Sequence, residues 1–110
     1  MRKKDEYILR YLPLFYDDLE QKALYIKEKL LNEKAAEDLI DDVEKAIRQR
    51  LSAPESFEPY HSGRNRRYPY YRIHVRNYTV YYVVIKDEGP QKIMEVRRLL
   101  YNGQNRNALI

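Results

Sequence analysis

The sequence predicts an α+β fold in which an antiparallel helical hairpin packs on a twisted, mainly antiparallel sheet, in the order β-α-α-β-β-β. A change in the spacing of apolar residues along the chain predicts this class. Apolar residues in the first half recur every three or four positions, as on helices, whereas those in the second half alternate or run continuously, as on strands. With 110 residues, 44% of them hydrophobic, the chain can form one core, and we expect a single domain over residues 1–110.

The first half predicts one strand and two helices. A short apolar run at residues 7–12 is closed by Pro13, as at the end of a strand. Apolar positions at helical spacing follow over residues 15–30. Asn32, a favoured N-cap residue, precedes a second amphipathic pattern over residues 36–51. Because the connection between the two helices is so short, they must form an antiparallel hairpin.

The second half predicts three strands. Residues 70–76 alternate, so we expect their apolar side chains against the hairpin and their polar side chains away from it. The apolar set is Tyr71, Ile73 and Val75, and the polar set is Tyr70, Arg72, His74 and Arg76. Residues 78–85 are β-branched or aromatic almost throughout, which is typical of a central strand buried on both faces. Turns at residues 76–77 and 87–90 separate this strand from its neighbours, and the last strand is predicted at residues 91–100.

Charge is distributed unevenly along the chain. Residues 1–52 carry 11 Lys or Arg against 12 Asp or Glu (net −1), and residues 53–110 carry 10 against 5 (net +5), which together give the total of +4. Five arginines lie between positions 64 and 76 with no acidic residue among them, and eight of the twelve tyrosines are in this half. Such a surface suits phosphates and bases, or an acidic protein. The alternative is a solvated arginine-rich loop beside a tyrosine-rich sheet.

Several kinds of chemistry lack the residues they need. The chain has no cysteine, which excludes disulfides and thiolate chemistry and suits a reducing compartment. Its two histidines fit no zinc spacing and its three glycines form no phosphate-binding loop, so we expect no metal and no other cofactor. No signal peptide is apparent and no apolar run approaches the roughly 18 residues of a membrane span, so we expect a cytoplasmic protein that does not contact membranes.

Three segments, in this order, resemble the RelE/ParE superfamily, the toxins of bacterial type II toxin–antitoxin pairs, which include many plasmid-stabilisation proteins. The segments are YLPLFYDDLEQ (residues 11–21), YYRIHVRNYTVYYVV (residues 70–84) and IMEVRRLLYNGQN (residues 93–105). The resemblance covers nearly the whole chain. It implies a compact toxin that is neutralised by a cognate antitoxin wrapping around it.

The superfamily has two kinds of target. One branch enters the ribosomal A site and cleaves messenger RNA, and the other inhibits DNA gyrase without being a nuclease. The nuclease branch has an arginine on the strand that Arg72 matches, and basic and aromatic residues near the C-terminus, where Arg98 and Tyr101 are the nearest matches. The spacing of VRRLLYNGQN resembles the gyrase branch instead, although residues 103–105 stand where that branch usually ends in arginines and an aspartate.

RNA cleavage by a 2′-hydroxyl needs a base and positive charge beside the phosphate. Arg72 and Arg98 would supply the charge, and His74, on the same side of its strand as Arg72, would act as the acid or base. Tyr101 or Tyr70 would donate a proton or stack on a base. Alternatively, Arg72 is a surface residue paired with an acid such as Glu95, and His74 is an outward polar residue. Further phosphate contacts are predicted for Arg64, Arg66, Arg67 and Arg76.

The first helix has more apolar residues than one narrow stripe needs. We therefore expect an exposed apolar patch that binds an antitoxin segment and is formed by Phe15, Tyr16, Tyr25 and Leu31.

We expect the toxin to act as a ribosome-dependent endoribonuclease that cleaves messenger RNA. The alternatives are a non-catalytic gyrase inhibitor and a degenerate member that binds only its antitoxin. The sequence leaves the oligomeric state open.

Overall fold

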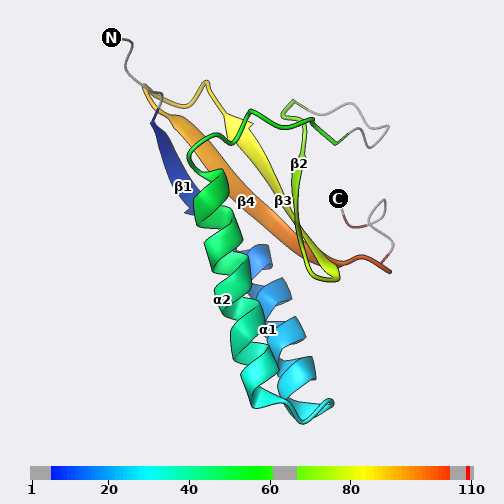
Figure 1. The fold of residues 1–110 in the computed structure, drawn as a ribbon. Helices are drawn as coiled ribbons and strands as arrows, with labels where there is room; N and C mark the ends of the chain where they lie inside the picture. Colours follow the sequence, from blue (N-terminus) through cyan, green and yellow to red (C-terminus); the bar gives the residue numbers. More distant parts are fainter. Residues whose placement is uncertain (1–5, 61–66, 105–108, 110) are drawn as a thin grey trace.

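The protein consists of a four-stranded sheet with a helical hairpin on one face (Figure 1). The computed structural model describes residues 6–60, 67–104 and 109. The strands are ordered β1-β4-β3-β2 across the sheet; β1 runs parallel to β4, and the other neighbours are antiparallel. This arrangement confirms the predicted α+β class and element order. The elements are β1 (Tyr7–Tyr11), α1 (Pro13–Glu28), α2 (Glu33–Arg50), β2 (Tyr71–Val75), β3 (Tyr78–Ile85) and β4 (Lys92–Tyr101).

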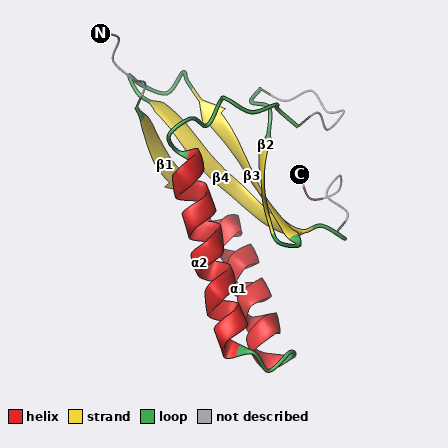
Figure 2. Cartoon of the chain, in the orientation of Figure 1, coloured by secondary structure: helices red, strands yellow, loops and turns green. Residues whose placement is uncertain are grey.

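The two helices form the predicted antiparallel hairpin, whose tip extends beyond the sheet (Figure 2). Pro13 is the first residue of α1, where its missing N–H costs no hydrogen bond. Leu31, in the turn between the helices, has a left-handed backbone with φ of 51°. Asn32 then caps α2, because its side-chain oxygen accepts a hydrogen bond of 3.0 Å from the N–H of Ala35. The N-cap read from the sequence is therefore confirmed.

The main core lies between the hairpin and the sheet. Leu39, Val43 and Ile47 of α2 belong to the same buried cluster as the apolar residues of β2, which are Tyr71, Ile73 and Val75. Arg72 and His74, which alternate with them, are not buried. The predicted register of this strand is confirmed, since a slip by one residue would exchange the two faces.

We call the sheet face turned away from the helices the outer face. A smaller cluster of buried apolar residues covers it, with Tyr60 and Tyr68 of the connector between α2 and β2 packed against them. Strand β3 contributes to both clusters, as predicted for a central strand. The buried members of the outer cluster are Tyr70, Tyr81, Val83, Ile85, Ile93 and Leu100.

One buried carboxylate joins the first helix to the last strand. The register between β1 and β4 ends where Tyr11 pairs with Val96, and α1 packs against β4. There Asp18 of α1, only 5% exposed, accepts hydrogen bonds from the backbone N–H of Leu99 (3.0 Å) and from Nε (2.8 Å) and Nη2 (2.9 Å) of Arg98. Asp18 thus binds both the backbone and a side chain of β4.

A second carboxylate fastens the connector to one end of the sheet. Glu55 accepts a hydrogen bond of 2.7 Å from the hydroxyl of Tyr7 and pairs with Lys92 at 3.1 Å and Lys86 at 2.5 Å. Burial alone would raise the pKa of Glu55, but the hydrogen bonds from Lys86, Tyr7 and Lys92 outweigh it and lower the pKa from 4.5 to about 2. Glu55 is therefore a carboxylate throughout the neutral and mildly acidic range.

The Asp18–Arg98 pair is expected to stabilise the fold strongly. Asp18→Leu should lower the free energy of unfolding by about 3–5 kcal/mol, because it leaves the guanidinium of a largely buried arginine without its partner. Arg98→Met should cost a similar amount, and the double variant should cost less than the sum of the two. Urea titrations of all four proteins measure this coupling. Strictly additive losses would contradict a direct interaction.

Glu55 should make stability depend on acidic pH. Its pKa is lower in the folded than in the unfolded chain, so its stabilising effect is complete above about pH 4.5 and disappears as the pH falls towards 2. We expect Glu55→Gln to lower the free energy of unfolding by about 1–3 kcal/mol at pH 7. Urea titrations at several pH values should show this difference shrinking from pH 5 to pH 2. A difference that stays constant over that range would contradict the lowered pKa.

Candidate functional site

The outer face carries two arginines that lie against tyrosine rings. The guanidinium of Arg72 is 4.5 Å from the ring centre of Tyr60, and that of Arg97 is 5.9 Å from the ring centre of Tyr70. Both distances allow cation–π contacts. Among the described residues, Arg72 forms no ion pair. This leaves a positive charge on the outer face, in the position where the sequence predicts one.

Glu95 is the buried acid of this face, but it does not pair with Arg72. It accepts hydrogen bonds from Nε of Arg10 (2.7 Å) and from Nε of Arg97 (2.9 Å). The hydrogen bond to Glu95 is the largest cause of the raised pKa of Arg10. The alternative reading of Arg72 as the partner of Glu95 is therefore wrong. Arg10 and Arg97 fill that role, whereas Arg72 forms no ion pair with any described residue.

His74 shares the outer face with Arg72, as predicted, and its side chain is exposed. Its Nδ1 lies 3.1 Å from the hydroxyl oxygen of Thr79, its register partner on β3. The hydroxyl of Thr79 in turn donates a hydrogen bond of 2.7 Å to Oδ1 of Asn102. Thr79 and Asn102 were not predicted from the sequence, because neither residue type nor spacing marks them.

The other two predicted catalytic residues have different surroundings. Two guanidinium nitrogens of Arg98 are held by Asp18, and its side chain is only 16% exposed. Tyr101 pairs with Tyr78, with the ring centres 5.9 Å apart, and Tyr78 packs against the core on the helix side. The register places Arg98 opposite Tyr81, and Tyr81 opposite Arg72, so Arg72, His74 and Arg98 occupy positions on the outer face. Of these three, Arg98 has its guanidinium bound to Asp18, whereas Tyr101 lies on the helix side of the sheet.

The predicted phosphate-binding arginines are also dispersed. Arg76 has a left-handed backbone with φ of 56° in the β2–β3 turn, and its side chain pairs with Asp42 of α2 at 2.6 Å. Arg67 pairs with Asp87 in the β3–β4 turn and lies 5.2 Å from the ring centre of Tyr68. Arg64 and Arg66 lie outside the described residues. Both described arginines of this group are thus bound to carboxylates.

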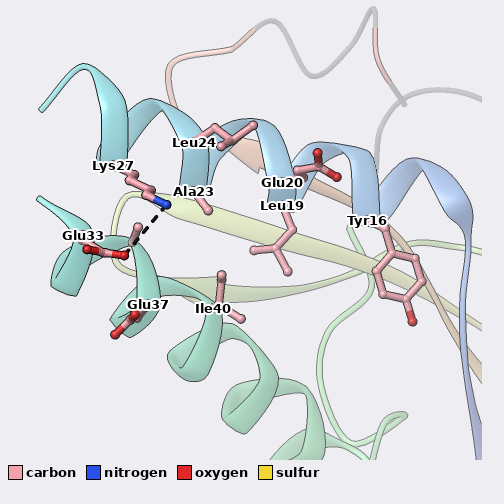
Figure 3. Close-up of a pocket in the computed structure, with 10 residues that line it drawn as sticks. Tyr16, Leu19, Glu20, Ala23, Leu24, Lys27, Glu33, Glu37 and Ile40 are labelled. Carbon is pink, nitrogen blue, oxygen red and sulfur yellow. Dashed lines mark ion pairs between the residues drawn. The ribbon is translucent and has the colours of Figure 1, made fainter. Parts of the chain in front are cut away.

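A second candidate site is a groove between the two helices (Figure 3). This hairpin groove has a volume of about 430 Å³. Glutamates stand along it together with Lys27, which pairs with Glu33 at 3.8 Å. Its apolar lining residues are Tyr16, Leu19, Ala23, Leu24, Ala36 and Ile40, and the glutamates are Glu20, Glu33 and Glu37. The groove offers an apolar floor with an acidic border.

Three of the four residues predicted to form an exposed apolar patch are exposed. Tyr16, Tyr25 and Leu31 are exposed, Leu31 by 85%, and Tyr16 also lines the hairpin groove. Phe15 is a correction, because it is only 2% exposed and belongs to the main core. The prediction also missed Leu24 and Ile40, two exposed apolar residues at the groove. Leu24 is an apolar residue outside the apolar stripe of its helix, and this position in the sequence could have indicated that it is exposed.

The described residues contain no group of three or more His, Cys, Asp or Glu side chains that could hold a metal ion. Within the same part of the chain, no helix is long and apolar enough to cross a membrane. The two candidate sites place cations beside aromatic rings on the outer face, and apolar side chains beside glutamates in the hairpin groove.

Comparison with known proteins identifies the family. No curated protein matches the chain. A family model described as the ParE toxin of the type II toxin–antitoxin system parDE matches residues 9–106. This match includes both helices, all but the start of the sheet and both candidate sites. The chain therefore belongs to the ParE toxin family of type II toxin–antitoxin systems.

Proposed function

We propose that this toxin acts by binding DNA gyrase and inhibiting it, and not by cleaving RNA. The observation that carries the proposal is that two of the four predicted catalytic residues are not available to act beside Arg72 and His74. General acid–base catalysis requires its groups to be within hydrogen-bond reach of one reacting phosphate. Arg98 is instead bound to Asp18, and Tyr101 lies on the helix side of the sheet.

The outer face supports binding to an acidic protein surface. Arg72 has an aromatic contact but no acidic partner among the described residues, so its charge is available to a target. The ring of Tyr60 beside it supplies an aromatic contact of the kind that is enriched at protein interfaces. An unpaired cation beside an aromatic ring would meet a carboxylate of the target and exclude water around it.

A second candidate function is ribosome-dependent cleavage of messenger RNA. One observation favours it: Arg72 and His74 lie on the same face of β2, and His74 is exposed. These two residues could supply charge and proton transfer if the ribosome contributed the remaining groups. The two candidates predict different products, which makes them separable by experiment.

The hairpin groove supports a separate role for the helices, the binding of the antitoxin. Its apolar floor matches the apolar face of an amphipathic helix, which is one of the common ways in which proteins bind peptides. Glu20, Glu33 and Glu37 along the groove favour basic residues on the flanks of that helix. The antitoxin would thus bind on the side of the molecule opposite the outer face.

The choice of target can be tested with the purified toxin. We expect inhibition of gyrase supercoiling, with intact transcripts in primer-extension maps from cells that express the toxin. Arg72→Ala should weaken inhibition about 10-fold or more, since an interfacial arginine often contributes over 1 kcal/mol. Arg48→Ala is the matched control, because Arg48 is exposed on α2 and paired with Glu44. Codon-spaced RNA ends that vanish in Arg72→Ala, with unchanged supercoiling, would instead establish the nuclease.

The antitoxin site can be tested with two variants of α1. Tyr16→Ala should weaken binding of the antitoxin encoded beside the toxin gene by about 10-fold or more, because Tyr16 lines the hairpin groove. Leu14→Ala is the control, since Leu14 is equally exposed on the same helix but does not line the groove. Calorimetric titration measures both affinities, and thermal unfolding checks that both variants fold. Equal losses in the two variants would argue against the groove as the antitoxin site.

A further inference from the structure

A pocket of about 370 Å³ lies where the C-terminal end of α2 and the following connector meet the edge strand β2. We call it the edge pocket. Its apolar part is formed by Ala46, Ala53 and Ile73, and the ring of Phe57 also lines it. Gln49 and His74 add an amide and an imidazole. The pocket is separate from the hairpin groove, and the proposed binding of gyrase and of the antitoxin does not use it.

The hydrogen bonds of His74 fix which of its ring nitrogens carries the proton. Oδ1 of Asn102 can only accept, so the single hydroxyl proton of Thr79 is donated to Asn102. The hydroxyl oxygen of Thr79 must then accept from Nδ1 of His74, which is 3.1 Å away. In the neutral imidazole, a proton on Nδ1 leaves Nε2 as an acceptor. Because the His74 side chain is exposed, this acceptor is accessible to a ligand.

Phe57 offers a flat surface for stacking in the same pocket. The guanidinium of Arg50 lies 3.5 Å from the centre of its ring, and Arg50 is held in place by hydrogen bonds to the carbonyl oxygen of Arg72 (3.1 Å) and the hydroxyl of Tyr82 (2.9 Å). Phe57 is nevertheless 49% exposed. An aromatic ring that is fixed on one side and open elsewhere is suited to stacking against a second ring.

We propose that the edge pocket binds an unpaired nucleobase, which stacks on Phe57 and donates an N–H hydrogen bond to Nε2 of His74. Every base has a planar face, and stacking on an aromatic side chain is the usual way in which single-stranded nucleic acids are held. Each common base also carries an N–H donor, and the amide of Gln49 can both donate to and accept from a base edge. Thr79 and Asn102 are the positioning residues, since they fix the proton of His74. This proposal goes beyond the binding of gyrase and of antitoxin and does not depend on either.

The first test concerns the imidazole itself. Nitrogen-15 NMR of the full chain at a pH where His74 is neutral should show Nδ1 protonated and Nε2 unprotonated. In Thr79→Val, which keeps the buried volume but removes the hydroxyl, that preference should be lost. Asn102→Ala should have a similar effect without touching the core, since Asn102 is exposed. A wild-type protein with the proton on Nε2 would overturn the proposed acceptor.

The second test is a titration of the chain with adenosine, guanosine, cytidine and uridine monophosphates, followed by NMR. We expect shifts at Phe57 and His74, none at Tyr25 on the hairpin, and affinity that falls about 10-fold or more in Phe57→Ala. Ribose 5-phosphate is the control that carries no base. Shifts with this control as large as those with the nucleotides would overturn the proposal and point to a phosphate site. No shift at Phe57 or His74 with millimolar nucleotide would also overturn it, whatever the gyrase assay shows.

Discussion

The ion pair between Asp18 and Arg98 is the constraint on which the rest of the structure depends. It joins residues 80 positions apart in the sequence and fixes α1 against β4. Because α1 and α2 form one hairpin, this bond also helps to set which face of the sheet the helices cover. The same bond occupies the guanidinium of Arg98, although the register places Arg98 opposite Tyr81 on the outer face. A carboxylate that stabilises the fold therefore also limits the chemistry that the surface can perform.

The fold could be predicted from the sequence because periodicity reports burial directly. The alternation over residues 70–76 placed Tyr71, Ile73 and Val75 against the helices, and the continuous apolar run over residues 78–85 marked a strand buried on both faces. Asn32 could be recognised as an N-cap from its residue type and its position before an amphipathic pattern. Each of these features depends on neighbours within a few residues.

The site could be predicted only in part, because its geometry depends on one bulge. The register pairs Tyr81 with Arg98 and Tyr82 with Val96, so Arg97 is an extra residue in β4. An extra residue reverses the faces of every later position on the strand. Without it, Tyr101 would share the outer face with Glu95; with it, Tyr101 lies beside Tyr78 on the helix side. The sequence VRRLLY does not reveal which residue is extra. Nor could the pairing of Arg98 with Asp18 be read from local spacing.

The separation of the two candidate surfaces constrains how an antitoxin can neutralise the toxin. The hairpin groove lies between the helices, whereas Arg72 lies on the face of the sheet that the helices do not cover. If the groove holds the antitoxin and the outer face holds the target, filling the groove alone would leave Arg72 accessible. Neutralisation would then require a further antitoxin segment that reaches around the edge of the sheet to the outer face. Alternatively, the bound antitoxin would have to be large enough to exclude the target sterically. Arg72 has no acidic partner among the described residues. An acidic antitoxin segment that reached Arg72 would therefore compete with the target for the same cation.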